Sequence, residues 1–136
     1  MAITITGVNH YAISVADLDE SIAWYERVFG FTVKSRGVLH ATGTGVCHMQ
    51  GPGVLLEIFC PQDPIPLPDD RRHPNMDNRT LGNKHISFGV PNAHILLGEF
   101  EKLGVEVVFI AELPGIYALF ICDNTGNLIE IFEEGE

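Results

Sequence analysis

The chain has 136 residues, 46% of them hydrophobic, so it can bury the core of one ordinary domain or of two very small ones. Its formal net charge of −10 argues against a nucleic-acid binder, which needs a basic surface to neutralise phosphates. The same charge argues against binding to an anionic membrane. It leaves a small anionic ligand open, because local charge can differ from net charge. The longest apolar runs are far too short to span a bilayer.

Cysteine usage and the N-terminus favour a reducing compartment. The three cysteines, Cys47, Cys60 and Cys122, are odd in number and widely spaced. They predict neither a disulfide framework nor a Cys-x-x-Cys metal clip. The opening stretch MAITITGVNH lacks the basic and then apolar pattern of a secretory signal. A cytoplasmic location is therefore the simplest interpretation.

The first part of the chain predicts a strand, a helix and three more strands. Residues 5–15 are rich in β-branched side chains and partly alternate, which is typical of a strand. A helix is expected over residues 17–30, with Asp17 as its N-cap and Glu20 three positions later. Gly30 suits the left-handed position that ends a helix. The stretches FTVKSRGV, GVCHMQ and GVLLEIFC then predict three strands.

Residues 61–82 differ in character from the rest. They contain five prolines, many charges and little periodicity. Because proline fixes φ and removes a hydrogen-bond donor, this segment is neither a helix nor a central strand. A connection of this length predicts a linker or a functional lid. Its arginines could meet a carboxylate or a phosphate, or could only balance neighbouring acids; they are Arg71, Arg72 and Arg79, beside Asp69, Asp70 and Asp77.

The same order of elements then starts again. Residues 84–90 predict a strand and residues 92–104 a helix, with Asn92 as a candidate cap and Gly104 after its end. Three strands follow, VEVVFI, IYALFIC and NLIEIFE. The turn DNTGN precedes the last of them, and Gly126 supplies its positive φ.

The chain therefore predicts an internal repeat. Aligning His10 with His85 places NHYAISV over KHISFGV and, at nearly the same distance further on, LLEIF over LIEIF. Each half has one histidine near the start of its first strand. Each half also has one glutamate, Glu57 or Glu130, in the middle of its last strand.

The two glutamates need an explanation, because burying a lone ionised carboxylate is costly. For either one alone, the simpler interpretation is a residue on the solvent face of a half-buried strand, or a neutral and hydrogen-bonded carboxyl. Two matching cases, each with a matching histidine, favour another interpretation. Two halves related by a pseudo-twofold axis would bring all four side chains to one point.

His10, Glu57, His85 and Glu130 would form a mixed nitrogen and oxygen site without a thiolate. Such a set suits one divalent ion, Zn²⁺, Ni²⁺, Co²⁺, Mn²⁺ or Fe²⁺. In octahedral geometry two positions stay open for water or a bidentate substrate, which is typical of a catalytic site. The two carboxylates would offset the charge of the ion.

The repeat, with NHYAISVADLDESIAWYERVFGF and CDNTGNLIEIFE, resembles the vicinal oxygen chelate superfamily. That superfamily includes glyoxalase I, methylmalonyl-CoA epimerase, extradiol dioxygenases, fosfomycin-resistance enzymes and bleomycin-resistance proteins. The resemblance implies an α+β fold in which two tandem βαβββ modules form a cupped, mixed eight-stranded sheet with the helices outside. We expect one domain, residues 1–136, made of module one (5–60), the connecting loop 61–82 and module two (83–134).

The four candidate ligands match the four ligand positions of bacterial glyoxalase I. Methylmalonyl-CoA epimerase resembles this pattern with a glutamine at the second position. Extradiol dioxygenases and fosfomycin enzymes look like proteins with three-ligand sites, two histidines and one glutamate, in which no residue has the role of Glu57. The retained Glu57 implies a metal-dependent isomerase, epimerase or lyase that transfers a proton through a metal-bound enediolate of a small oxygenated substrate. The base would be Glu57 or Glu130, with Glu130 preferred.

The sequence leaves two alternative functions and several details open. The protein could be an extradiol-type dioxygenase with Fe²⁺ or Mn²⁺ bound by His10, His85 and Glu130, or a non-catalytic binder as in bleomycin resistance. The loop 61–82 has no obvious glutathione-binding signature, so the use of glutathione or coenzyme A is open. A homodimer is expected, because small modules with exposed sheet edges commonly pair. The four ligands could come from one chain or from two.

Four further side chains are candidates for contact with the substrate, although each could instead be packed or solvated. His48 lies in a strand before Glu57, and Arg72 and His73 lie in the loop that could close as a lid. Tyr117 belongs to a strand that should line the cup, where its hydroxyl could bond a substrate oxygen. His94, at the start of the second helix, is expected to face solvent.

Overall fold

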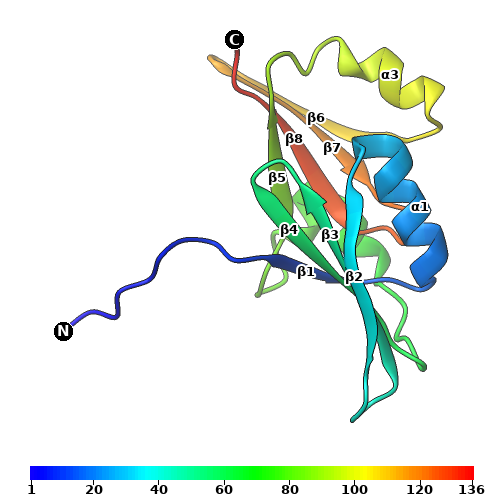
Figure 1. The fold of residues 1–136 in the computed structure, drawn as a ribbon. Coiled ribbons are helices and arrows are strands. Elements are labelled where there is room, and N and C mark those ends of the chain that lie inside the picture. The colour runs from blue at the N-terminus through cyan, green and yellow to red at the C-terminus, as the bar shows by residue number, and fades with distance from the viewer. The chain divides into compact units, whose positions relative to one another are not determined.

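The computed structural model describes all 136 residues and divides into two compact units, Met1–Pro64 and Ile65–Glu136. The first unit contains β1 (Tyr11–Ser14), α1 (Leu18–Phe29), β2 (Thr32–Leu39), β3 (Thr44–Gly51) and β4 (Val54–Cys60) (Figure 1). The second contains η1 (Asp69–Arg72), α2 (Pro74–Asp77), β5 (Ile86–Val90), α3 (Leu96–Lys102), β6 (Val107–Leu113), β7 (Ile116–Cys122) and β8 (Leu128–Glu133).

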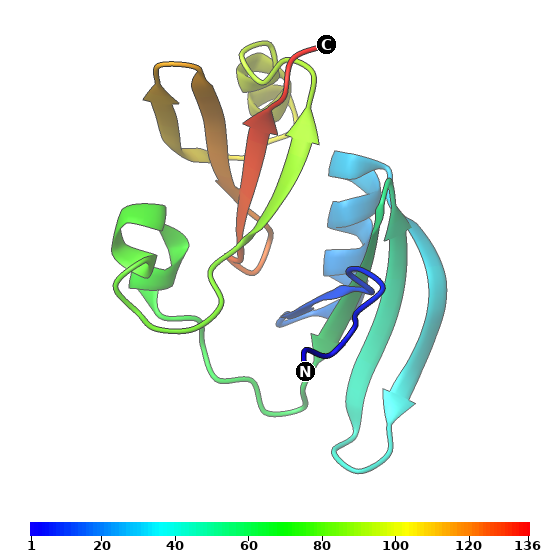
Figure 2. The ribbon, with the colours of Figure 1, turned by 90° about the vertical axis from the view of Figure 1, so that its left-hand side faces the viewer.

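Each unit has one four-stranded sheet, and the two sheets have the same topology. The strand orders are β1-β4-β3-β2 and β5-β8-β7-β6 (Figure 2). In each sheet the first strand runs parallel to the last, and the other neighbours are antiparallel. The α+β class with two tandem βαβββ modules is therefore confirmed. The assignment of both modules to one domain stays a prediction.

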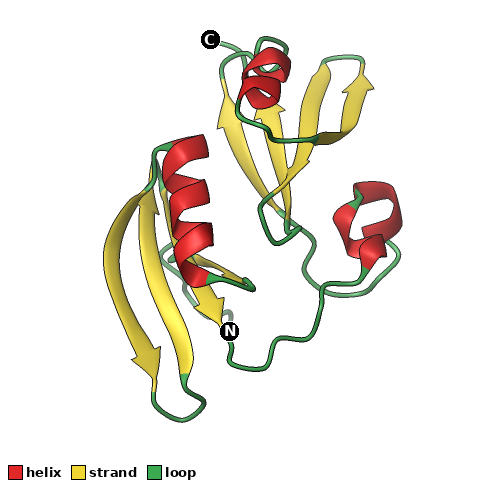
Figure 3. Cartoon of the chain, turned by 90° about the vertical axis from the view of Figure 1, so that its right-hand side faces the viewer, coloured by secondary structure: helices red, strands yellow, loops and turns green.

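Helix α1 has the ends that the sequence predicts. The Asp17 side chain accepts the backbone N–H of Glu20 at 3.0 Å, and Gly30 is left-handed with φ of 68°. The helix lies along one face of the first sheet, where it contacts β3 and β4 (Figure 3). The core between them includes Tyr25 on the helix and, on the strands, Cys47, Met49, Leu56 and Ile58. The other face of the sheet is left for polar side chains.

The second sheet also buries one of its faces. Four side chains on β7 and β8 are at most 1% exposed, namely Leu119, Ile121, Ile129 and Ile131. They are cross-strand partners, Leu119 beside Ile131 and Ile121 beside Ile129. Phe100 of α3 is buried too. Because side chains alternate along a strand, Phe120 and Glu130 point to the opposite face.

Three predicted elements are longer than the observed ones. The strand expected over 84–90 is β5, which begins at Ile86. Residues 5–10 were expected to belong to the first strand, but β1 begins at Tyr11, and Ile5 and Val8 are exposed. The second helix was expected over 92–104 and covers only Leu96–Lys102. No helix of the chain combines the length and the apolar character needed to cross a membrane.

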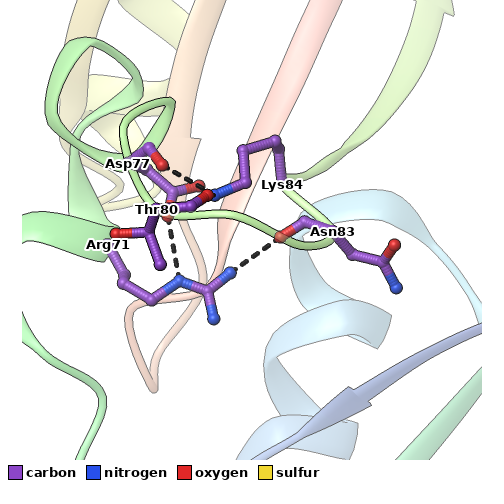
Figure 4. Close-up of polar contacts among 5 residues, drawn as sticks. All are labelled: Arg71, Asp77, Thr80, Asn83 and Lys84. Carbon is purple, nitrogen blue, oxygen red and sulfur yellow. Dashed lines mark hydrogen bonds and ion pairs between the residues drawn. The ribbon is translucent and has the colours of Figure 1, made fainter.

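The proline-rich segment packs as part of the second unit, which begins at Ile65. The expectation that it contains no helix is wrong, because it forms the two short helices η1 and α2, and Pro74 begins α2, where a missing N–H is tolerated. Asp77 at the end of α2 is only 1% exposed. Arg71 Nε donates to Asp77 Oδ1 at 2.9 Å, and Lys84 Nζ lies 3.3 Å from the same oxygen (Figure 4). Lys84 also donates to the carbonyl oxygen of Thr80, and Arg71 to that of Asn83. Asp77 thus ties the segment to the residues directly before His85.

Replacing Asp77 tests this anchor. In Asp77→Ala, Arg71 and Lys84 would lose their carboxylate partner while staying partly buried, so the free energy of unfolding should fall by about 1–3 kcal/mol. Asp70→Ala is the matched control, because Asp70 is exposed, and it should change the value by less than about 0.5 kcal/mol. Urea denaturation of both variants measures the difference. Equal stability of the two variants would contradict the anchoring role.

Candidate functional site

The two histidine–glutamate pairs occupy equivalent places in the two modules. Glu57 on β4 pairs in register with the β1 residue that lies two positions after His10. Glu130 on β8 pairs with the β5 residue that lies two positions after His85. Register partners in parallel strands share a face, and so do residues two positions apart. In each module the histidine and the glutamate therefore belong to the same face of the sheet.

In module one these side chains form a polar ladder, made of Asn9, His10, Glu57, His48 and Ser35. His10 Nε2 lies 3.4 Å from Glu57 Oε1, and His48 Nε2 lies 2.7 Å from Glu57 Oε2. The ladder continues at both ends, because Ser35 Oγ is 2.9 Å from His48 Nδ1 and His10 Nδ1 is 2.8 Å from Asn9 Oδ1. The Glu57 side chain is 18% exposed. Its two oxygens therefore each face an imidazole.

Strand register places the ladder on the face opposite α1. Ser35 on β2 pairs with His48 on β3, and His48 pairs with Glu57 on β4. The residues next to them in sequence, such as Cys47 and Ile58, are fully buried on the helix side. A carboxylate can thus occupy the apolar strand VLLEIFC, because only the alternate residues enter the core.

Module two has the same register but different surroundings. Glu130 pairs with Phe120, and the His85 ring packs edge-on against Phe120 with centroids 5.0 Å apart. The ring centroids of Phe109 and Phe120 are 6.3 Å apart, and those of His73 and Phe109 are 5.4 Å apart. No ion pair joins His85 to Glu130, and no other side chain holds the Glu130 carboxylate. The glutamate of this module faces an aromatic row, whereas Glu57 faces a polar ladder.

Three of the candidate substrate contacts can be located from these neighbours. His48 belongs to the ladder and contacts Glu57, so it lies close enough to contact a molecule bound at Glu57. His73 lies beside Phe109, on the face that carries Glu130. Arg72 is exposed, and its guanidinium reaches Asp69 only at 4.0 Å. The role of each in binding stays a prediction.

Tyr117, the fourth candidate for contact with the substrate, lies on the face of the second sheet opposite Glu130. Phe120 pairs with Glu130, and Tyr117 lies an odd number of residues earlier on β7, so its side chain points the other way. There it stacks on the His94 ring with centroids 3.5 Å apart. His94 is exposed, as expected, and it also contacts Tyr117 and Glu133.

Sequence reasoning missed Glu133, which anchors the approach to α3. Glu133 Oε2 accepts the backbone N–H of Ala93 at 2.7 Å and lies 2.8 Å from His94 Nδ1. The hydrogen bond from His94 is the main cause that lowers the pKa of Glu133; partial burial opposes it, and the backbone N–H groups of Ala93 and His94 add to it. The sequence did contain one signal: Glu133 lies three residues after Glu130 on the same strand, which places the two side chains on opposite faces of the sheet.

The lowered pKa of Glu133 predicts a pH-dependent stability. A carboxyl group whose pKa is lower in the folded state stabilises the fold fully above its unfolded pKa, and this contribution is lost as the pH falls through the folded pKa. The stability difference between wild type and Glu133→Gln should therefore be full at neutral pH and shrink below about pH 4.3. Urea denaturation across this range measures it. A difference that stays constant down to about pH 3 would contradict the assignment.

The donor atoms fit a divalent metal ion, although no three histidine, cysteine, aspartate or glutamate side chains are arranged to hold one. His10 Nε2 and Glu57 Oε1 are 3.4 Å apart. Neighbouring ligands that each lie about 2.1 Å from one ion are about 3 Å apart, so a small side-chain movement suffices for both to reach it. Imidazole and carboxylate together suit first-row divalent metals.

Known proteins resemble the chain along nearly its whole length. The family model for the Glyoxalase/Bleomycin resistance protein/Dioxygenase superfamily matches residues 7–131. Glyoxylase I 4 of Arabidopsis thaliana is 28% identical over 131 residues, which are 93% of this chain and 70% of the relative.

Solved structures share the fold. The glyoxalase family protein from Enterococcus faecalis superposes with a TM-score of 0.78 at 19% identity, over 94% of this chain and 98% of that one. The fosfomycin resistance protein FosX of Listeria monocytogenes, crystallised with Mn(II) and a dihydroxypropylphosphonic acid, gives a TM-score of 0.69 at 16% identity, over 95% and 93% of the two chains. The chain belongs to the glyoxalase, bleomycin resistance and dioxygenase superfamily.

Proposed function

We propose that this protein is a divalent-metal-dependent enzyme of the isomerase, epimerase or lyase type, acting by proton transfer on a small oxygenated substrate. One observation carries the proposal. The same histidine–glutamate register occurs in both modules, although the surroundings of the two pairs differ. The recurrence of both residue types at matched positions supports a shared role in binding. The two pairs, from two modules of one chain or of two chains, would together bind one ion through His10, Glu57, His85 and Glu130.

The bound ion, which this donor set would allow to be Ni²⁺, Co²⁺, Zn²⁺, Mn²⁺ or Fe²⁺, would hold two neighbouring substrate oxygens and stabilise the charge that develops when a carbon loses its proton. Similar proteins support this class. One relative is called a glyoxylase I, and one structural neighbour was crystallised with Mn(II).

The surroundings of the two glutamates support Glu130 as the base that moves the proton. Glu57 is held between His10 and His48, so its orientation is fixed. Glu130 has no side-chain partner, and its carboxylate can turn between an ion and a substrate proton. Phe120 beside Glu130 offers an apolar contact for the carbon skeleton of a substrate. In this proposal Glu57 binds and Glu130 both binds and transfers the proton.

His48 would act as a positioning residue for Glu57. Its Nε2 lies 2.7 Å from one Glu57 oxygen, while Ser35 engages its Nδ1 at 2.9 Å. This leaves the other Glu57 oxygen, on the side of His10, for an ion. Carboxylates and histidines that support metal ligands in this way commonly affect metal affinity.

The same contact supports a second candidate function, a ring-cleaving dioxygenase. If His48 holds Glu57 away from the ion, the remaining set is His10, His85 and Glu130. Two histidines and one carboxylate with open positions are the ligands of many non-haem iron oxygenases. Whether Glu57 binds the ion therefore distinguishes the two candidate functions. The homodimer and the cytoplasmic location remain predictions from the sequence.

Metal content of purified variants tests the proposal. We expect about one divalent ion per chain in wild type, loss of the ion in His10→Ala, and weakened retention in Glu57→Gln, because each change removes a donor. His40→Ala is the matched control, because His40 is an exposed histidine outside both pairs, and it should retain the ion. Elemental analysis gives the content, and circular dichroism checks that each variant is folded.

The outcomes distinguish the candidates. Weaker metal retention in Glu57→Gln, together with loss of carbon-acid exchange activity in Glu130→Gln, would support the isomerase or lyase function. Iron that survives Glu57→Gln, with oxygen uptake on a catechol, would support the dioxygenase. A wild-type protein that takes up none of the five metals would overturn both and leave a non-catalytic binder.

A further inference from the structure

A second candidate binding site lies on the opposite face of the second sheet. An open pocket of about 290 Å³ is lined by His94, Glu112, Leu113, Gly115, Ile116, Tyr117 and Glu133. This volume is near the lower end of the ~300–1,000 Å³ typical of small-molecule sites. All lining residues belong to the second unit, and none is one of the four candidate metal ligands. The pocket therefore stands independently of the proposed metal site.

Strand register brings the polar groups of the pocket into one row. Glu112 on β6 pairs with Tyr117 on β7, and the next step of the β7–β8 register brings Tyr117 beside Glu133. His94 stacks on the Tyr117 ring and bonds Glu133. Three adjacent strands and the loop before α3 thus contribute to one surface.

The contact with Glu133 fixes the chemistry of the His94 ring. Glu133 is held ionised, because the hydrogen bond from His94 lowers the pKa of this carboxyl. A carboxylate can only accept hydrogen bonds, so Nδ1 of His94 carries the proton that is donated to it. In the neutral ring Nε2 is then an acceptor with a free lone pair. Glu133 itself is already engaged by His94 and by the N–H of Ala93.

Two further oxygens of the pocket have no hydrogen-bond partner in the protein. Tyr117 is only 8% exposed, yet its hydroxyl bonds no protein group and the residue lines the pocket. Burial raises the pKa of Tyr117, and the charges of Glu112 and Glu133 add to the effect, so the hydroxyl stays protonated at neutral pH. The Glu112 carboxylate is exposed and forms no ion pair. The Tyr117 side chain is thus held in place by burial while its hydroxyl stays accessible, so it can bond a ligand atom in the pocket.

We propose that this pocket binds the ammonium group of a small primary alkylamine. A primary ammonium has three N–H donors, and the pocket offers three acceptors in the Glu112 carboxylate, the Tyr117 hydroxyl and His94 Nε2. The carboxylates favour a cation over an anion or a neutral alcohol. Leu113 and Ile116, which are 63% and 40% exposed, offer apolar contact for the alkyl chain.

Titration of the full-length protein with n-butylamine near neutral pH tests the proposal. Backbone amide shifts of Gly115, Ile116 and Tyr117 in ¹H–¹⁵N spectra should move and saturate. Butan-1-ol has the same chain without the charge, and butyltrimethylammonium has the charge without N–H donors. Both should bind about tenfold more weakly or worse, because each lacks the charge-assisted hydrogen bonds.

Variants locate the site. Glu112→Gln should weaken butylammonium binding about tenfold, and Tyr117→Phe should weaken it by a smaller factor with the fold retained. Glu101→Gln is the matched control, because it removes an exposed carboxylate of α3 that does not line the pocket. His10→Ala should bind the amine like wild type, so a failure of the metal proposal would leave this result unchanged.

Three outcomes would overturn the proposal. They are the absence of saturable shifts, equal binding by butyltrimethylammonium, and unchanged binding in Glu112→Gln. Equal binding of the trimethyl cation would indicate attraction to a generally acidic surface instead of a site with matched acceptors.

Discussion

The parallel pairing of the first strand with the last strand of each module is the constraint on which the rest of the structure depends. The helix that follows the first strand must cross the sheet, and it covers one face, so only alternate residues of the strands enter the core. The other face is free to carry polar side chains. Because the pairing has the same register in both modules, it repeats one histidine and one glutamate at matched positions. The apolar strands tolerate Glu57 and Glu130 for this reason.

The features that local signals control could be predicted from the sequence. The cap at Asp17, the left-handed Gly30 and the repeat of one strand, one helix and three strands all depend on neighbouring residues. The start of β1 could not be predicted, because it depends on pairing with a distant strand: only Tyr11–Ser14 pair with β4, from Leu56 to Phe59. The prolines of 61–82 predicted irregular structure. They gave no indication that Asp77 would be buried between Arg71 and Lys84, since that depends on packing between distant residues.

The prediction of the candidate site depends on the repeat, which doubles its signal. One histidine or one glutamate in a strand is uninformative, whereas two matched pairs indicate a shared role. The faces of other residues were harder to assign. His48 contacts Glu57 because the register of the β3–β4 hairpin pairs them. Tyr117 lies on the face opposite Glu130 because the β7–β8 register pairs Glu130 with Phe120, three residues after Tyr117. Sequence alone gives the alternation within a strand. It does not give the register across a turn, which decides the neighbours on the next strand.

The two modules keep the same register but have diverged in what surrounds it, and this difference bears on chemistry. In the proposed metal site each half would supply one imidazole and one carboxylate. In the proposed proton transfer Glu130 would turn toward the substrate while Glu57 stays in place. Module one fixes Glu57 with two histidines, whereas module two leaves Glu130 unpaired beside the aromatic rings of Phe120 and His85. A duplicated fold can therefore provide symmetric binding and asymmetric reactivity, because changes next to each strand alter the freedom of a glutamate without altering its position.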